Sequence, residues 1–195
     1  MATWKSAALL LALAAGSFGW IARPAPATPV APQEGGAPPG PSDQHKALAR
    51  YVGNWDAEME MAPAGEGMPA EKSKAKATCK LGLGGLWLIT DFEGALMGAP
   101  FLGHEVTGYD PLTKKYVLSW FDSMTPTAST GTAEYDAATK TMHSWVSGKD
   151  AMGAPSEFHG TDVWSDDDHR TWTMWMKGPD GKEFAALTIR YARRK

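Results

Sequence analysis

Five histidines are the first residues of this sequence that could carry chemistry, and they are His45, His104, His143, His159 and His169. Their spacing matches neither the HExxH zinc motif nor a zinc finger, and the chain has no CxxC. If three of them lie on strands, His104, His143 and His159 could converge across a barrel and bind zinc or haem iron. Because single strand histidines are usually half-exposed hydrogen-bonding residues, the sequence predicts no metal and no cofactor. Haem or metal binding remains an alternative.

Acidic pairs are the second candidate for chemistry. Glu105 with Asp122, or Asp91 with Glu93, could act as general acid and base. Glycosidase-like chemistry also requires a defined separation of two carboxyl groups across a cleft, which a sequence does not reveal. No Gly-x-Ser-x-Gly, Walker or dinucleotide-binding motif occurs. The acidic run 166–168 lacks the ligand spacing of an EF-hand, so it is predicted to be part of a solvated turn, 165–170. We therefore predict no catalytic residue, and an enzyme stays an alternative.

The segment 108–124, GYDPLTKKYVLSWFDSM, is typical of a strand, a tight turn and a second strand. On the second strand, residues 116, 118, 120 and 122 share one face. We interpret Tyr109, Trp120 and Asp122 as the wall of a pocket. The alternative is a structural hairpin in which Asp122 and Ser123 cap backbone groups of a turn.

The elements that must position these residues are predicted to be strands. Alternation of apolar and polar residues indicates about ten of them, at residues 55–61, 72–81, 86–94, 101–109, 115–122, 130–135, 140–146, 157–164, 171–177 and 183–193. Short turns imply antiparallel neighbours, and closure would remove two bare edges. We predict an all-β, antiparallel meander barrel with a short N-terminal helix, capped by Ser42 or Asp43 and ended by Gly53. Its apolar face would be His45, Leu48, Ala49 and Val52.

Composition limits the partners. The 195 residues carry a net charge of -3 at pH 7 and form no basic stripe, so nucleic acid is not an expected partner. The single cysteine, Cys79, excludes an intrachain disulfide, and we expect it to be a buried small hydrophobe. The ten methionines suit either core packing or an adaptable apolar cavity, and Trp172, Met174 and Met176 share one strand face.

The N-terminal residues are predicted to direct export. Residues 1–27 combine Lys5 with an apolar run at 7–15 that is short for a membrane span, which is typical of a signal peptide. An uncleaved anchor is the alternative, and the protein would then contact the membrane only through this segment. Residues 28–41, rich in Pro, Ala and Gly, are predicted to be a disordered linker before a barrel domain at 42–195. The expected location is the periplasm or the exterior of a bacterial cell envelope.

Several motifs carry a resemblance to a known family. They are GNW at 53–55, LGGLW at 83–87, Gly103 ahead of GYD at 108–110, and WFDSM at 120–124. As a set in this order they resemble the DUF1579 family, a bacterial family of unknown function, over about residues 44–193. More distantly, a Gly-x-Trp on the first strand and an Arg on the last resemble lipocalin-like and fatty-acid-binding-like barrels. That resemblance implies that Trp55 closes one barrel end and that Arg190 or Arg193 covers it.

The favoured function is non-enzymatic binding of a small apolar or amphipathic ligand inside the barrel. The candidate ligand-binding residues are Trp87, His104, Tyr109, Trp120, Asp122, Trp145 and Trp172, with His104 and Asp122 as polar anchors. A filled barrel acting as an envelope protein-interaction or structural module is the main alternative. An interior void above roughly 300 Å³ would favour the ligand. Neither the ligand's identity nor the oligomeric state follows from the sequence.

Overall fold

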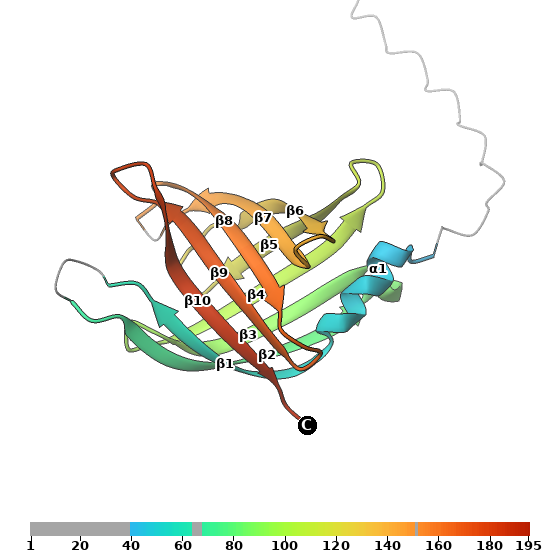
Figure 1. Cartoon of the computed structure of the whole chain (residues 1–195), viewed down its shortest axis with the longest axis horizontal. Coiled ribbons are helices and arrows are strands. Elements are labelled where there is room, and N and C mark those ends of the chain that lie inside the picture. Colours follow the sequence, from blue (N-terminus) through green and yellow to red (C-terminus); the bar gives the residue numbers. More distant parts are fainter. Residues whose placement is uncertain (1–39, 64–67, 151) are drawn as a thin grey trace, which may run out of the picture. The chain divides into compact units, whose positions relative to one another are not determined.

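Ten antiparallel strands run in chain order around a closed barrel, as Figure 1 shows for the computed structural model. The structure describes residues 40–63, 68–150 and 152–195. The strands are β1 (Gly53–Met61), β2 (Glu71–Gly82), β3 (Trp87–Leu96), β4 (Ala99–Asp110), β5 (Lys115–Asp122), β6 (Ser129–Asp136), β7 (Thr141–Lys149), β8 (Pro155–Trp164), β9 (His169–Lys177) and β10 (Glu183–Arg193). Pairing of β1 with β10, from Trp55 opposite Arg193 to Met61 opposite Leu187, closes the barrel. The predicted meander barrel is confirmed.

A short helical segment precedes β1 and covers one end of the barrel. It consists of α1 (Asp43–Ala47) and the 3₁₀ helix η1 (Leu48–Tyr51). Ser42 is the N-cap and forms a capping box with His45. His45 and Leu48 are buried, whereas Ala49 and Val52, which we expected on the same face, are exposed. The 3₁₀ turn explains the difference, because its repeat of three residues brings His45, Leu48 and Tyr51 onto one face.

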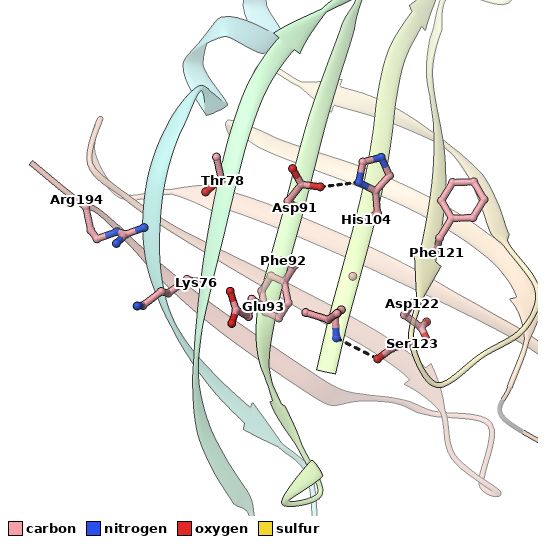
Figure 2. Close-up of a pocket in the computed structure, with 12 residues that line it drawn as sticks. Lys76, Thr78, Asp91, Phe92, Glu93, His104, Phe121, Asp122, Ser123 and Arg194 are labelled. Atoms are coloured by element: carbon pink, nitrogen blue, oxygen red, sulfur yellow. Dashed lines mark hydrogen bonds and ion pairs between the residues drawn. The ribbon is translucent and has the colours of Figure 1, made fainter. Parts of the chain in front are cut away.

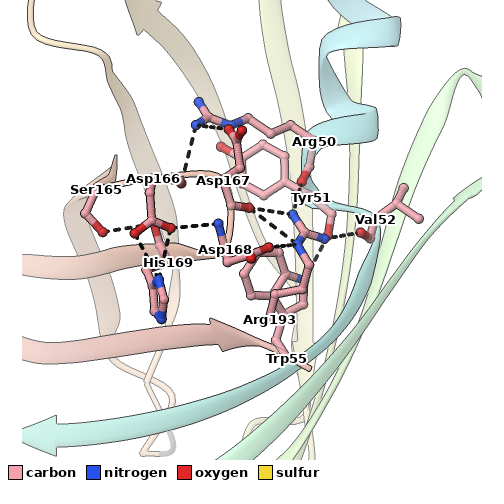
Figure 3. A network of polar contacts seen from close by, with 10 residues as sticks. All are labelled: Arg50, Tyr51, Val52, Trp55, Ser165, Asp166, Asp167, Asp168, His169 and Arg193. Atoms are coloured by element: carbon pink, nitrogen blue, oxygen red, sulfur yellow. Dashed lines mark hydrogen bonds and ion pairs between the residues drawn. The ribbon is translucent and has the colours of Figure 1, made fainter. Parts of the chain in front are cut away.

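Trp55 closes this end of the barrel and is 0% exposed. Its indole Nε1 donates a hydrogen bond to the Tyr51 carbonyl oxygen at 2.9 Å. The Arg193 guanidinium lies 4.1 Å from the ring centroid (Figure 3), so the predicted plug and cover are confirmed. Of the two arginines considered, Arg193 is the cover, since Arg190 is exposed and pairs with Glu60 at 3.0 Å.

The turn between β8 and β9 holds Arg193 in place. Arg193 Nε donates to Asp168 Oδ1 at 3.2 Å, and the guanidinium also donates to the backbone oxygens of Arg50, Val52 and Asp167 (Figure 3). Gly53 makes room for this group: its φ is +138°, and a Cβ there would lie 2.8 Å from Arg193 Nη1. Arg193 therefore joins the acidic turn to the last strand and to the segment just before the first strand.

The predicted signal peptide, residues 1–27, lies outside the described residues, as does the predicted linker 28–41 except for its last two residues. In the part of the chain that the structure describes, no helix has both the length and the apolar character needed to cross a membrane.

Candidate functional site

The barrel encloses a cavity of about 610 Å³, lined by residues from η1 and from every strand except β2. This volume exceeds the roughly 300 Å³ at which small-molecule sites begin. Alternation along each strand sends every second side chain inward. On β5, for example, Tyr116, Leu118, Trp120 and Asp122 line the cavity. The core is therefore hollow in the middle. A packed interior would have favoured an envelope module with a filled core, and the cavity does not favour that alternative.

The half of the cavity opposite the helix is apolar and rich in methionine. Met61, Met124, Met174 and Met176 line it, together with Leu96 and Phe184. The lining extends to side chains that solvent reaches, since Met97 is 67% exposed and Phe184 is 44% exposed. Methionine side chains adapt to irregular apolar shapes. This end is therefore suited to admit and contact an apolar group.

The half beneath the helix holds a buried ion pair. Arg170 Nη1 and Asp162 Oδ2 lie 2.7 Å apart, and each side chain is 8% exposed. The Arg170 guanidinium lies 3.7 Å from the Tyr191 ring centroid and 5.2 Å from that of Tyr51. Within the described residues, Asp162 Oδ1 and Arg170 Nε have no hydrogen-bond partner. Such unpaired buried atoms are rare in folded proteins. Both atoms are enclosed by protein, whereas the two side chains as a whole are part of the cavity wall.

The pKa values of the pair reflect competing effects. Burial raises the pKa of the Asp162 carboxyl, and the Arg170 guanidinium opposes that rise. Burial disfavours the charged form of Arg170, but Asp162 together with Tyr191, Tyr51 and Cys79 outweighs burial and raises the pKa of the guanidinium. The two side chains form an ion pair, because a 2.7 Å contact with a permanently charged guanidinium stabilises the carboxylate directly.

Other titratable groups surround the pair. Burial raises the pKa of the Tyr51 and Tyr191 hydroxyls, so both stay protonated at neutral pH. Burial also raises the pKa of Glu105, although the hydrogen bond from Thr107 and the charge of Arg170 lower it. Thr107 Oγ1 donates to Glu105 Oε1 at 2.8 Å. Glu105 lines the cavity, so the part of its side chain that is not buried faces the interior of the barrel. This end of the cavity is polar but carries little net charge.

Of the seven sequence-predicted ligand-binding residues, Trp120, Asp122 and Trp172 line the cavity. Asp122 uses both carboxylate oxygens within the protein itself. Oδ2 accepts from Trp120 Nε1 at 2.9 Å, and Oδ1 accepts from the backbone N–H groups of Met124 and Thr125. The turn-capping alternative thus describes what Asp122 does in this structure, and Trp120 and Trp172 remain as wall residues.

The other four predicted residues lie elsewhere. Tyr109 lies under the helix, where its ring contacts Tyr116 and His45, and it is not part of the cavity lining. Trp145, 50% exposed, stacks on His159 on the outer face of the barrel. Trp87 packs over Gly108, where a Cβ would lie 2.6 Å from the indole ring. His104 also lies on the outer face. Strand alternation explains the outward position of Trp145, because its neighbours Ser144 and Val146 point inward and line the cavity.

An outer groove of about 550 Å³ contains His104 (Figure 2). His104 Nδ1 lies 2.7 Å from Asp91 Oδ1, and these side chains are 45% and 53% exposed. Lys80 also approaches Asp91, at 3.8 Å. These are solvated surface contacts, so the groove is a weaker candidate site than the interior.

The histidines do not converge inside the barrel. His143 and His159 contact each other at 3.1 Å between ring nitrogens, whereas His104 contacts Asp91. Among residues 40–63, 68–150 and 152–195, no group of three His, Cys, Asp or Glu side chains is placed to hold a metal ion. Cys79 is buried, as expected, and burial raises the pKa of its thiol.

The polar end of the cavity was not predicted from the sequence. Arg170 falls in the predicted turn 165–170, but β9 begins at His169, so Arg170 is a buried strand residue. A signal was present, because Arg170 is in phase with Trp172 and Met174. Asp162 is likewise in phase with Phe158 and Trp164. A charged residue in the apolar phase of a strand indicates a functional or paired interior group.

These features define a ten-stranded, lipocalin-like barrel with a mixed apolar and polar interior. The chain belongs to the family described as "Protein of unknown function (DUF1579)", whose model matches residues 40–193. A comparison with curated proteins found no match.

Several solved structures share the fold. The crystal structure of Rv2717c from M. tuberculosis matches with a TM-score of 0.57 and 11% identity, covering 79% of this chain and 99% of that chain. The S-type phycobiliprotein lyase CPES from Guillardia theta matches with a TM-score of 0.51 and 12% identity, covering 78% and 93%. At these identities the likeness concerns the fold alone.

Proposed function

We propose that this protein binds a small apolar or amphipathic molecule inside the barrel and performs no chemistry on it. The observation that carries the proposal is the cavity of about 610 Å³. Its wall is mainly apolar, and a few polar groups gather at one end, which is the usual composition of a small-molecule site. The neighbour named a phycobiliprotein lyase has a similar fold, but no activity is carried over from it.

Ligand entry is proposed at the methionine-rich end. That end carries exposed lining residues, Met97 and Phe184, whereas η1 and Trp55 cover the other end. An amphipathic molecule would place its apolar part among the methionines and its head near Arg170.

The proposal is tested by native mass spectrometry of the protein purified from its own host, where a co-purifying small molecule is expected. Titration with the neutral fluorescent probe N-phenyl-1-naphthylamine extends the test. Leu118→Trp should fill the cavity, because Leu118 lines it, and should abolish probe binding. Ser119→Trp is the matched control, since the next residue of the strand points outward. Equal probe binding by the two variants would refute an interior site.

Export is part of the same proposal. The predicted signal peptide supports a periplasmic or secreted location, and cell fractionation with N-terminal sequencing of the mature protein tests it. A mature chain that begins near residue 28 is expected. A chain that keeps residues 1–27 and sediments with membranes would instead support the uncleaved anchor.

A further inference from the structure

We infer that the cavity selects ligands with an uncharged head group that both donates and accepts hydrogen bonds, such as an alcohol or a primary amide. This inference rests on the proposed function and names the chemical class of its ligand. It predicts that a fatty carboxylate and an alkylammonium ion are poorer ligands than the matched neutral molecules.

The charge at the deep end of the cavity is already balanced. Arg170 is the cation there, and Asp162 neutralises it at 2.7 Å. Glu105 also lines this end, and because burial raises the pKa of its carboxyl and so favours the neutral form, it supplies neither a free cation nor a strong free anion. A carboxylate head would meet Asp162 and Glu105 without a free cation, and an ammonium head would meet Arg170. Burying an unpaired charge is strongly unfavourable, so a neutral head is preferred.

The unfilled hydrogen-bonding capacity points to the same class. Glu105 and Tyr191 both line the cavity, and Thr107 occupies only Oε1 of the Glu105 carboxyl. A head that donates to one of these two groups and accepts from the other satisfies both. Leaving a buried polar group unpaired costs about 1–3 kcal/mol. A purely apolar ligand leaves both groups unpaired and is therefore also expected to bind less well.

A second cation lines the cavity at the opposite end. Lys149 is the last residue of β7 and is exposed. A carboxylate placed beside it would remain solvated, so Lys149 offers no equivalent of a buried anion site. Lys149→Gln is therefore a control that should not change the order of ligand affinities.

The test compares four ligands with the same alkyl chain: lauryl alcohol, lauramide, laurate and laurylammonium. Each displaces N-phenyl-1-naphthylamine from the full protein at neutral pH. The alcohol and the amide are expected to bind about tenfold more tightly than the two ions, the ratio that corresponds to one unpaired buried group. Asp162→Asn keeps the shape but leaves Arg170 unbalanced, so laurate should become the preferred ligand.

A second variant guards against loss of folding in Asp162→Asn. The double variant Asp162→Leu with Arg170→Met replaces the pair by apolar side chains, a change that buried pairs often tolerate. It should bind the probe and, because the cation is removed together with its partner, should not bind laurate more tightly than the alcohol.

The outcomes are distinct. If the wild-type protein binds laurate or laurylammonium as tightly as the alcohol, the head-group inference is overturned while ligand binding stands. If neither the probe nor any ligand enters the cavity, the proposed function fails and the inference falls with it.

Discussion

Trp55 and Arg193 lie directly opposite each other in the β1–β10 pairing, and the guanidinium of Arg193 lies 4.1 Å from the centroid of the Trp55 ring. The contact joins the first strand to the last at the end of the barrel that the helix covers. Because Arg193 also binds the β8–β9 turn, one side chain ties together three segments that are distant in sequence.

Arg193→Met is therefore expected to destabilise the fold by about 2–4 kcal/mol, since it removes a cation–π contact and several hydrogen bonds to charged or backbone groups. Urea unfolding measures the change. Arg190→Met is the matched control on the same strand, because Arg190 makes an exposed ion pair with Glu60, and it should change stability by less than about 1 kcal/mol. Equal effects of the two variants would contradict the role of Arg193.

Gly103 and Gly108 provide a second matched pair on β4. A Cβ on Gly103 would lie 2.2 Å from Trp120 Cη2, and one on Gly108 would lie 2.6 Å from Trp87 Cε3. Trp120 lines the cavity and Trp87 does not. Gly103→Ala should push the Trp120 ring into the cavity and weaken binding of N-phenyl-1-naphthylamine severalfold. Gly108→Ala should leave probe binding unchanged, although both variants lose stability. Unchanged binding by Gly103→Ala would show that Trp120 does not shape the site.

Glu105 predicts a pH dependence of stability. Burial raises its folded-state pKa above the ordinary value of 4.5, so the folded protein holds the proton to a higher pH than the unfolded chain does. This residue therefore makes stability fall as pH rises from 4.5 through its folded-state pKa, and it has no effect below both values. Glu105→Gln should match the wild type near pH 4 and exceed it near pH 8, by about 1.4 kcal/mol for every tenfold difference in proton affinity between the folded and unfolded states.

Urea unfolding at several pH values measures this difference. Glu93→Gln is the control, because it removes a carboxylate that lies exposed on the outer face of the neighbouring strand β3 and leaves the interior unchanged. A Glu105→Gln variant that is less stable at high pH would show that an ionised Glu105 is stabilised by Arg170 instead.

Two tryptophans on opposite faces of the wall test the location of the site. Trp172 lines the cavity, whereas Trp145 is 50% exposed on the outside. Trp172→Phe should weaken probe binding severalfold through lost contact area, and Trp145→Phe should leave it unchanged. Displacement titrations on both variants decide the matter. Weaker binding in Trp145→Phe would move the site to the outer face.

Several features of the fold were predictable from sequence because they depend on local patterns. Strict alternation in residues 55–61 and the turn at 110–114 determine strand and hairpin without reference to distant residues. The choice of Arg193 over Arg190 was also available, because Arg193 is in phase with the apolar residues Ile189 and Tyr191.

The cavity's chemistry was not predictable in this way. On β7, Met142 and Val146 occupy one phase and Trp145 the other, so both faces carry large apolar groups. Only closure of the barrel decides that the phase of Met142 faces inward. The proximity of Glu105 to Arg170 also depends on closure of the barrel. Glu105 is on β4 and Arg170 is on β9, and these two strands face the same interior only because the strands between them curve around it.

The sequence by itself determined which residues share a strand face and where the chain turns, and the resemblance to lipocalin-like barrels implied that Trp55 would close one end. Tertiary structure alone decided which face is interior and which charges meet there. The physical reason is the separation along the sequence of the residues involved. Alternation arises from the geometry of adjacent peptide units. The Asp162–Arg170 pair, in contrast, is buried by strands from around the barrel, and no local pattern specifies which residues lie across it.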